Sequence, residues 1–323
     1  MFVLVVHEDR KSIQMNHEVC QFLEKLFLTN QLNRLPVAYG GDRIFDAPLI
    51  GVARGDDLIF EKFKEVVAPE HLTPAEMWTA SGLPNDSGLA ARLRILSIVF
   101  PYVRLIREEG RKAEAMPAEI YCVGRNYANE FMRDVLKQTK EFFERRGYRA
   151  VAGITSPAFK LITKSDPMRV YSVWSERHIA FAAGMGTFSL HEGLITEAGC
   201  NVRIASVITD MPLQVTLRRS DEPYANCLYY AKGTCRECEK RCPADGAITE
   251  AGHNKFPCWA FGRVIEKEMT ERLQPILKPH HRRVNDADTY SYPVGCAFCQ
   301  FGVPCMDRNP MAAAQRKEIE TGP

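Results

Sequence analysis

The sequence has 323 residues, of which 46% are hydrophobic and 25% are charged, and its formal net charge at pH 7 is +2. This composition excludes a collagen-like or disordered chain, and the balance of 42 basic and 40 acidic side chains excludes a strongly basic nucleic-acid-binding chain. The length suffices for about two domains of roughly 150 residues each.

The chain shows no sign of a membrane span or an export signal. Its longest apolar stretches, such as residues 95–103, are too short for a bilayer, and that stretch contains Pro101. The N-terminal apolar run lacks a preceding basic region, a cleavage site and a twin arginine. We therefore expect a cytoplasmic protein.

The first part of the chain has the pattern of a mixed α and β region. Apolar spacing predicts a helix over residues 18–28 and another over 89–109, the second interrupted by Pro101. Residues 118–123 predict a short buried strand. Residues 126–146 predict a helix capped near its start by Asn126 or the residue before it.

The second part begins near residue 220, where we predict a domain boundary. Residues 203–209 predict a last strand before it, and 259–273 predict a helix after it. Residues 275–293 predict a long irregular loop, and 311–323 a polar tail.

Cysteines distinguish the second part from an ordinary soluble domain. The chain has 11, and eight of them lie between residues 227 and 305: Cys227, Cys235, Cys238, Cys242, Cys258, Cys296, Cys299 and Cys305. Clustered CxxC spacings in a chain without a signal peptide are typical of metal or iron–sulfur ligands. The other three, Cys20, Cys122 and Cys200, are expected to be small buried hydrophobes and are left out of the site.

The strongest motif is CxxCxxxCP, formed by Cys235, Cys238, Cys242 and Pro243. It resembles the end of the bacterial ferredoxin run, in which short turns direct several thiolates at one cubane and the cysteine before proline reaches a second cluster. The run normally has one more cysteine at the position of Lys232, and Cys227 is the available replacement.

Four cysteines remain for a second cluster. By the ferredoxin crossover, we predict one 4Fe–4S cluster on Cys227, Cys235, Cys238 and Cys305, and another on Cys242, Cys258, Cys296 and Cys299. Two structural zinc sites of four cysteines each are the alternative, although zinc ribbons do not need the Cys-Pro step.

The order of motifs resembles the corrinoid-dependent reductase superfamily, which contains epoxyqueuosine reductases and reductive dehalogenases. The resemblance covers roughly residues 118–310. Four stretches carry it: the YCVGRNY segment at 121–127, the ER…AAGMGTF segment at 176–188, the SVITDMPL segment at 206–213, and the eight cysteines.

This resemblance implies an α+β protein with a nitroreductase-like corrinoid-binding domain over residues 1–220, of which 1–115 is divergent. A ferredoxin-like domain with two 4Fe–4S clusters would follow over 221–310. The implied cofactors are the clusters and cobalamin or a related cobamide. Electrons would come from a low-potential donor such as ferredoxin or flavodoxin and pass through the clusters to cobalt.

The same resemblance implies a corrinoid site at Gly124, Arg125 and Asn126 and at Gly184, Met185, Gly186, Thr187 and Phe188. From the residues alone, the two glycines at 184 and 186 allow close approach of a flat ligand or simply end a helix. Arg125 could pair with a corrin propionamide, with the nucleotide-loop phosphate or with a surface carboxylate.

The sequence departs from epoxyqueuosine reductases at the expected proton donor. These enzymes carry an aspartate six residues before the Glu-Arg pair, and here that position is Val170; Asn126 also replaces a family aspartate. We therefore name Tyr127, Tyr171 and Glu176 as candidate catalytic residues, with His178 as a further candidate.

We expect the substrate to be a small organic molecule, because the chain has no basic surplus that would suit tRNA and no helical-repeat region after Cys305. Three other functions stay open: an iron–sulfur electron-transfer protein, a corrinoid carrier, and a reductive activator of a partner corrinoid protein. The oligomeric state is not predicted.

Overall fold

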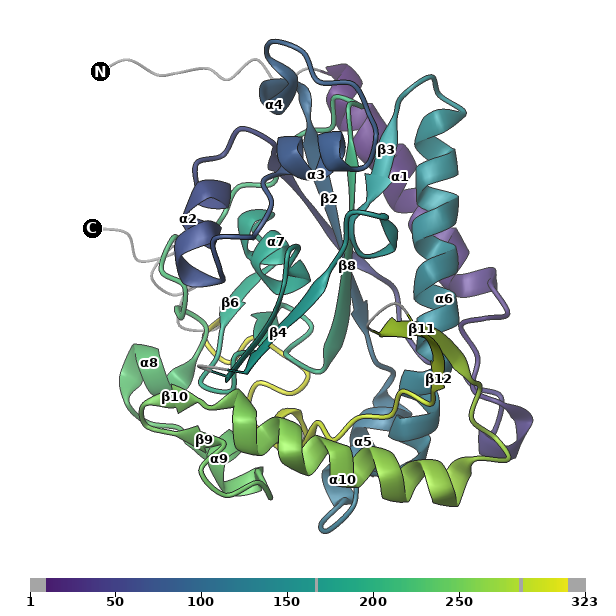
Figure 1. Cartoon of the computed structure of the whole chain (residues 1–323), viewed down its shortest axis with the longest axis vertical. Coiled ribbons are helices and arrows are strands. Elements are labelled where there is room, and N and C mark those ends of the chain that lie inside the picture. The colour runs from purple at the N-terminus through teal and green to yellow at the C-terminus, as the bar shows by residue number, and fades with distance from the viewer. Residues whose placement is uncertain (1–9, 166–167, 285–286, 313–323) are drawn as a thin grey trace.

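A computed structural model describes residues 10–165, 168–284 and 287–312, and it shows a mixed α and β protein (Figure 1). The main helices are α1 (Arg10–Thr29), α2 (Ile59–Val66), α3 (Pro74–Ala80), α4 (Leu89–Arg92), α5 (Arg104–Lys112), α6 (Glu119–Glu144), α7 (Glu176–Ala182), α8 (Leu228–Lys232), α9 (Glu237–Arg241) and α10 (Lys255–Leu273). The short 3-10 helices are η1 (Val37–Tyr39), η2 (Gly153–Thr155) and η3 (Phe298–Gln300).

A four-stranded antiparallel sheet forms the centre of the molecule, in the order β1 (Leu49–Arg54), β2 (Arg94–Pro101), β8 (Val202–Thr209) and β3 (Ala150–Ala152). Four two-stranded ribbons accompany it: β4 (Leu161–Ser165) with β5 (Met168–Ser172), β6 (Gly186–Phe188) with β7 (Leu194–Thr196), β9 (Ile248–Thr249) with β10 (Gly252–His253), and β11 (His280–Val284) with β12 (Ala287–Ser291).

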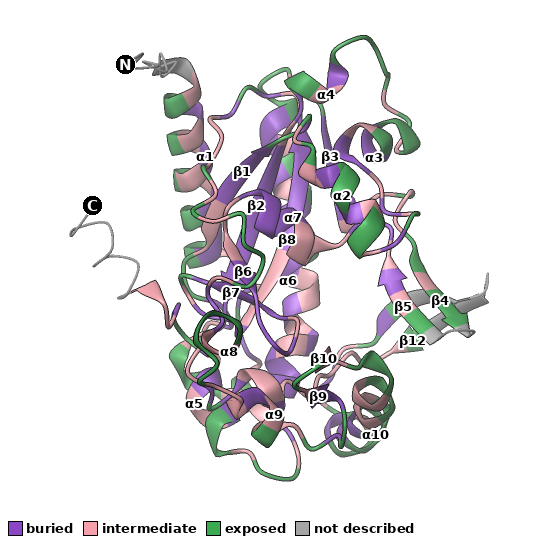
Figure 2. Cartoon of the chain, turned by 90° about the vertical axis from the view of Figure 1, so that its left-hand side faces the viewer, coloured by how far each residue is buried: buried purple, intermediate pink, exposed green. Residues whose placement is uncertain are grey.

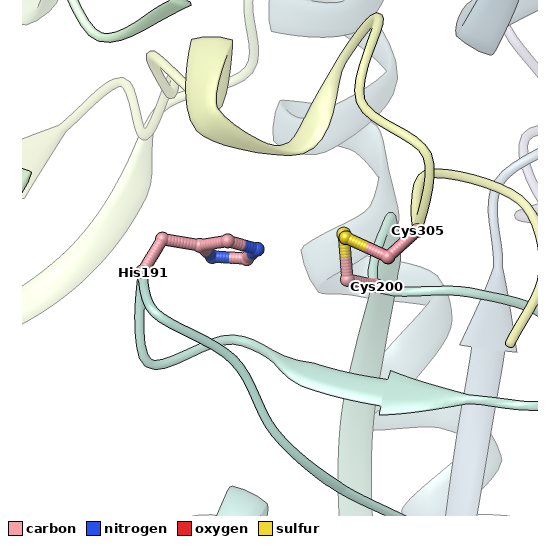
Figure 3. A group of neighbouring side chains, drawn as sticks. All are labelled: His191, Cys200 and Cys305. Carbon is pink, nitrogen blue, oxygen red and sulfur yellow. The ribbon is translucent and has the colours of Figure 1, made fainter. Parts of the chain in front are cut away.

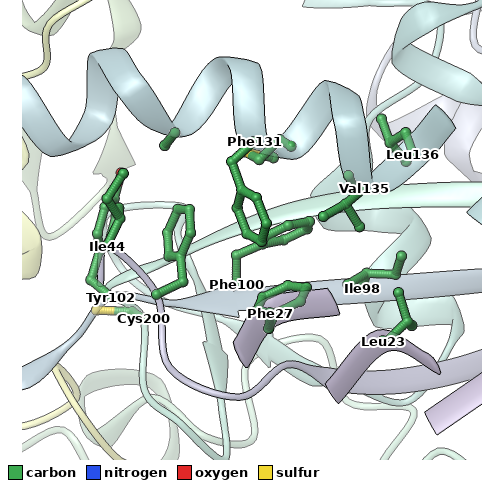
Figure 4. Close-up of a cluster of buried hydrophobic side chains, with 14 of the residues drawn as sticks. Leu23, Phe27, Ile44, Ile98, Phe100, Tyr102, Phe131, Val135, Leu136 and Cys200 are labelled. Atoms are coloured by element: carbon green, nitrogen blue, oxygen red, sulfur yellow. The ribbon is translucent and has the colours of Figure 1, made fainter. Parts of the chain in front are cut away.

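Both faces of the central sheet are covered by helices, which makes three layers (Figure 1). Successive side chains of a strand point to opposite faces, so Leu96, Ile98 and Phe100 of β2 join the core under α1 and α6, whereas Ile95 joins the core under α2, α3 and α7. Figure 4 shows the first core, where Phe27 of α1 packs 4.9 Å from the ring of Phe100. Because both faces are buried, β2 has an almost continuous apolar sequence.

The cysteine-rich part lies at one end of the sheet and includes α8, α9, α10 and η3 (Figure 1). The buried residues of helix α10 are Ile265, Met269 and Leu273, and its other residues are partly or fully exposed (Figure 2). These three side chains belong to the same hydrophobic core as α1 and α6. The domain boundary near residue 220 stays a prediction. Among the described residues, no helix is both long and apolar enough to cross a membrane.

Four predicted elements are confirmed and three are corrected. The helix over 126–146 is confirmed as far as residue 144, as the later part of α6. The helices over 18–28 and 259–273 and the strand over 203–209 lie within α1, α10 and β8. The predicted strand over 118–123 is wrong, because α6 already begins at Glu119, and Asn126 therefore lies inside the helix rather than at its cap. A short apolar run fits a buried helix as well as a strand, and only packing separates them.

The helix predicted over 89–109 is also wrong in its middle, where the chain forms β2 between α4 and α5. Pro101 is the last residue of that strand, where it pairs with Val202 of β8. The loop predicted over 275–293 contains the β11–β12 ribbon. The predicted tail lies outside the described residues from 313 onward.

Candidate functional site

Four of the predicted cysteine ligands lie close to one another around a small cavity. Burial, followed by the sulfur atoms of Cys305, Cys227 and Cys235, raises the pKa of Cys238 to about 12. Burial raises the pKa of Cys235 as well, with Cys305 and Cys227 acting in the same direction. The four thiols line one small cavity together with His191. We call Cys227, Cys235, Cys238 and Cys305 set I.

The other four predicted ligands form a second group. Burial raises the pKa of Cys296 to about 11, and Cys242 and Cys258 add to the rise. Burial and the sulfur atoms of Cys296, Cys242 and Cys258 raise the pKa of Cys299 far above its ordinary value, and Cys238 of set I contributes last. We call these four residues set II. The two sets adjoin, and the assignment of each set to one cluster stays a prediction.

One residue of the CxxC turn in set II has an uncommon backbone conformation. Within the Cys296–Cys299 turn, Ala297 adopts a left-handed φ of 53°, an uncommon conformation for a residue other than glycine. Neighbouring sulfur atoms disfavour one another's negative charge when no cation is present, whereas a metal centre favours the thiolate form. The donor chemistry of both sets therefore fits the two predicted clusters.

Two residues outside the eight cysteines stand beside Cys305. The side-chain ligand atoms of His191, Cys200 and Cys305 all lie within 4.8 Å of one another (Figure 3). The Cys200 and Cys305 sulfur atoms are 3.7 Å apart, and Cys200 and His191 lower the pKa of Cys305. This group was not predictable from residue spacing, because its members come from separate segments of the chain.

A large cavity of about 1200 Å³ lies between the first part of the chain and the start of α10. Its walls come from α2, the β4–β5 ribbon, α7, the chain around residue 220, and residues 253–259; Figure 2 shows α2, β5 and α10 on one side of the molecule. Drug-sized ligands fill pockets of about 300–1000 Å³, so this cavity exceeds what a small substrate alone requires. Cys258 of set II is part of its wall.

Charged groups cluster where this cavity meets set II. Nδ1 of His253 and Nζ of Lys255 each lie 3.4 Å from Oε2 of Glu192. Although burial opposes it, the contact with His253 and the charges of Lys255 and Arg177 hold the pKa of Glu192 at about 2. Arg177 donates through Nη1 to the Glu192 carbonyl, and Glu192 has a left-handed φ of 58°. An ionic network therefore borders Cys258.

Apolar and aromatic side chains form the deeper wall of the cavity. Phe188 lines it with Phe63 and Phe181, and its ring lies 4.7 Å from that of His178. Burial, with the nearby positive charge of Arg177, lowers the pKa of His178 to about 3, so the imidazole is neutral at physiological pH. Phe188 is thus the member of the predicted corrinoid set that lines this cavity.

The three predicted catalytic residues are not together. Tyr171 lines the cavity, beside Glu70 and Lys164. Glu176 starts α7 with both carboxyl oxygens buried, and burial raises its pKa to about 8 while nearby Ser206 and Trp174 act in the opposite direction. The hydroxyl of Tyr127 donates to the Ile276 carbonyl at 3.0 Å, and Tyr127 does not line the cavity.

The predicted corrinoid residues on α6 also lie away from the cavity wall. Gly124 packs against Ile106 of α5, with 3.0 Å between the Ile106 Cδ1 and the place of a Cβ at Gly124. Arg125 is partly buried and donates through Nε to the Val294 carbonyl at 3.3 Å. Asn126 bonds the backbone of Lys278. These residues join α6 to the segments that follow α10.

The second glycine-containing stretch serves local structure. Gly184 has a φ of 71°, and a Cβ at Gly186 would lie 2.2 Å from the Ile195 carbonyl oxygen. Met185 packs closely against Gly51 of β1, and Oγ1 of Thr187 accepts the N–H of Asn226 at 2.8 Å. The corrinoid role predicted for these residues stays a prediction, and their observed contacts explain the glycines without it.

Comparison with known proteins gives structural neighbours only. No protein-family model matches the chain, and no curated protein matches it. Among solved structures, the chain is similar to an epoxyqueuosine reductase bound to a modified tRNA stem loop, with 16% identity over 94% of this chain and 71% of that one and a TM-score of 0.46. The Streptococcus thermophilus epoxyqueuosine reductase is also similar, with 14% identity over 92% of this chain and 70% of that one and a TM-score of 0.45.

A reductive dehalogenase studied for B12-dependent dehalogenation is also similar, with 16% identity, a TM-score of 0.37, and coverage of 62% of this chain and 23% of that one. The neighbours are epoxyqueuosine reductases and reductive dehalogenases. The resemblance named from the sequence is confirmed to this extent. At these identities and TM-scores the likeness carries no conclusion about the activity of this chain.

Proposed function

We propose that the protein is a corrinoid-dependent reductase in which two 4Fe–4S clusters deliver electrons for the reduction of a small organic substrate. The proposal rests on the position of Cys258, which belongs to set II and also lines the 1200 Å³ cavity. Sets I and II adjoin, so together with the cavity they form a continuous series.

The residues of the cavity fit a bound corrinoid and its substrate. When bound, the corrinoid would supply a strongly reducing and nucleophilic metal centre. Phe63, Phe181 and Phe188 would exclude water from the reacting groups. Tyr171 is the proposed proton donor, because of the three predicted catalytic residues it is the one that lines the cavity. Its neighbour Val170, at the position where epoxyqueuosine reductases carry an aspartate, also lines the cavity.

Exposed apolar side chains around the cavity favour a second candidate, a reductive activator of a partner corrinoid protein. Leu58, Val66, Leu161, Phe256 and Trp259 all line the cavity, and their exposed fractions range from 43% to 83%. Contiguous exposed apolar surface is typical of a site that binds another macromolecule. In this case a partner's cofactor would enter the cavity from outside.

The proposal includes a cytoplasmic location and a ferredoxin or flavodoxin as electron donor. A small molecule is the proposed substrate because the net charge is only +2. The tRNA stem loop found with one structural neighbour belongs to that protein.

The test is anaerobic reconstitution with iron, sulfide and hydroxocobalamin, followed by gel filtration, metal analysis and EPR during stepwise reduction. We expect two reduced 4Fe–4S signals and cobalt that co-elutes with the protein. Val170→Trp should keep the iron but lose the cobalt, because the indole would occupy the cavity. Val37→Trp is the matched control, since Val37 is 91% exposed, and it should retain both metals.

Each contrary outcome selects a different function. Two cluster signals with all cobalt free in solution would reject the reductase and favour electron transfer or the activator. Bound zinc without iron would reject the iron–sulfur assignment and favour the structural zinc alternative.

A further inference from the structure

His191 carries its ring proton on Nε2. It lies between β6 and β7, is 4% exposed, and its Nδ1 accepts the backbone N–H of Gly193 at 3.3 Å. A nitrogen that accepts a hydrogen bond has no proton of its own, so the neutral ring must hold its proton on the other nitrogen. The loop holds this ring tightly, because a Cβ at Gly193 would lie 2.4 Å from the His191 Cε1.

That proton is directed at set I. Figure 3 shows the imidazole of His191 pointing toward the sulfur atoms of Cys200 and Cys305. Nε2 is buried and has no hydrogen-bond partner within the part of the chain that the structure describes. A buried N–H without an acceptor is costly, and a thiolate sulfur at this position would satisfy it.

Cys200 is held beside Cys305 by the backbone. Its N–H donates to the Cys305 carbonyl at 2.8 Å, and the next N–H, of Asn201, donates to the Met306 carbonyl at 3.1 Å. Gly199 permits this approach, because a Cβ there would lie 2.4 Å from the Met306 carbonyl oxygen. The 3.7 Å separation of the two sulfur atoms is therefore set by the chain path as well as by side-chain rotamers.

The hydrogen bond at Nδ1 favours His191 as a hydrogen-bond donor over His191 as a metal ligand. Ligation through Nε2 would require the ring proton to move to Nδ1, where it would face the Gly193 N–H. His191 also lines the small cavity that set I surrounds, whereas Cys200 does not. Both residues lie next to Cys305, and neither belongs to the predicted ligand set.

We propose that His191 and Cys200 donate hydrogen bonds to the sulfur of Cys305 and thereby raise the reduction potential of the cluster on set I. This inference rests on the proposed function, since it requires that cluster. Donors to cluster sulfur stabilise the more negative reduced state, and removing them lowers the potential. His191 and Cys200 are positioning residues, because they act through the Cys305 sulfur.

The test is an anaerobic redox titration of the reconstituted full chain, followed by EPR. We expect His191→Leu and Cys200→Ala each to lower the midpoint of the set I signal and leave the other signal in place. The expected change in the reduced-to-oxidised ratio is about tenfold, equivalent to about 59 mV for a one-electron couple. His191→Gln and Cys200→Ser keep a donor and should restore much of the potential.

His280→Leu is the matched control, because His280 is also buried with an unpartnered Nε2 among the described residues but is not part of this group. It should move neither midpoint. Intact clusters with unchanged midpoints in both His191→Leu and Cys200→Ala would overturn this inference alone. Loss of the set I cluster from folded His191→Leu and His191→Gln would make His191 a ligand and also overturn it. A wild-type chain that binds no iron would overturn the proposed function with it.

Discussion

The side chain of Asn126 and the backbone of Lys278 are joined by two hydrogen bonds. Nδ2 of Asn126 donates to the Lys278 carbonyl at 3.0 Å, and the Lys278 N–H donates to Oδ1 at 2.9 Å. The two residues are 152 positions apart, and Asn126 is fully buried in α6. The neighbouring Tyr127 bonds Ile276 in the same segment. Residues expected from the family resemblance to serve the cofactor thus tie two distant parts of the chain together.

Replacing Asn126 should therefore affect stability first. Asn126→Ala leaves the partly buried N–H and carbonyl of Lys278 without these partners, and we expect it to lower the free energy of unfolding by about 1–3 kcal/mol. Urea unfolding measures the change. Lys137→Ala, at an exposed position of the same helix, should change it by no more than about 0.5 kcal/mol. Normal stability with lost corrinoid binding would instead support the cofactor role.

A substitution at Gly186 also distinguishes a structural role from a role in cofactor binding. In Gly186→Ala the new Cβ would lie 2.2 Å from the Ile195 carbonyl oxygen, so the β6–β7 ribbon must shift. We expect a loss of about 1–3 kcal/mol in thermal or urea unfolding. The control is Gly262→Ala in α10, where no atom lies within 4 Å of the new Cβ, and there we expect a gain of up to about 1 kcal/mol. Equal effects at both sites would contradict the steric argument.

Paired cysteine variants test the division into set I and set II. Cys238→Ala and Cys258→Ala should each remove about half of the bound iron, because each set holds one predicted cluster. The double variant Cys238→Ala/Cys305→Ala should still retain about half, whereas Cys238→Ala/Cys258→Ala should retain almost none. Cys20→Ala serves as the control outside both sets. Equal iron in the two double variants would show that the sets are wrongly divided.

Glu176 should make stability depend on pH. Its pKa is raised from 4.5 to about 8 by burial, so between these values the folded state holds a proton that the unfolded state has released. Stability therefore falls as pH rises through this window, with a slope of at most about 1.4 kcal/mol per pH unit from this group. Glu176→Gln should flatten that slope in urea unfolding from pH 5 to pH 8. An unchanged slope would show that Glu176 is ionised in the folded state.

The sequence determined those features that depend on short-range geometry. The CxxCxxxCP spacing keeps Cys235, Cys238 and Cys242 within eight residues of one another, so a site built from these thiols was predictable, whereas their division between two clusters stays a prediction. Helices α1 and α10 and strand β8 were predictable because their apolar residues recur with a regular period. Where the period was ambiguous, as at the start of α6, packing decided the element.

Tertiary structure decided everything that depends on distance across the chain. Cys200 and Cys305 are 105 residues apart, and only the backbone pairing of their segments brings their sulfur atoms to 3.7 Å. The cavity wall likewise combines Tyr171, Phe188 and Cys258, which share no motif. Tyr127 and Asn126 lie in a motif but face the segment after α10 instead. Such contacts follow from how two cores pack on one sheet, a property that residue spacing does not encode.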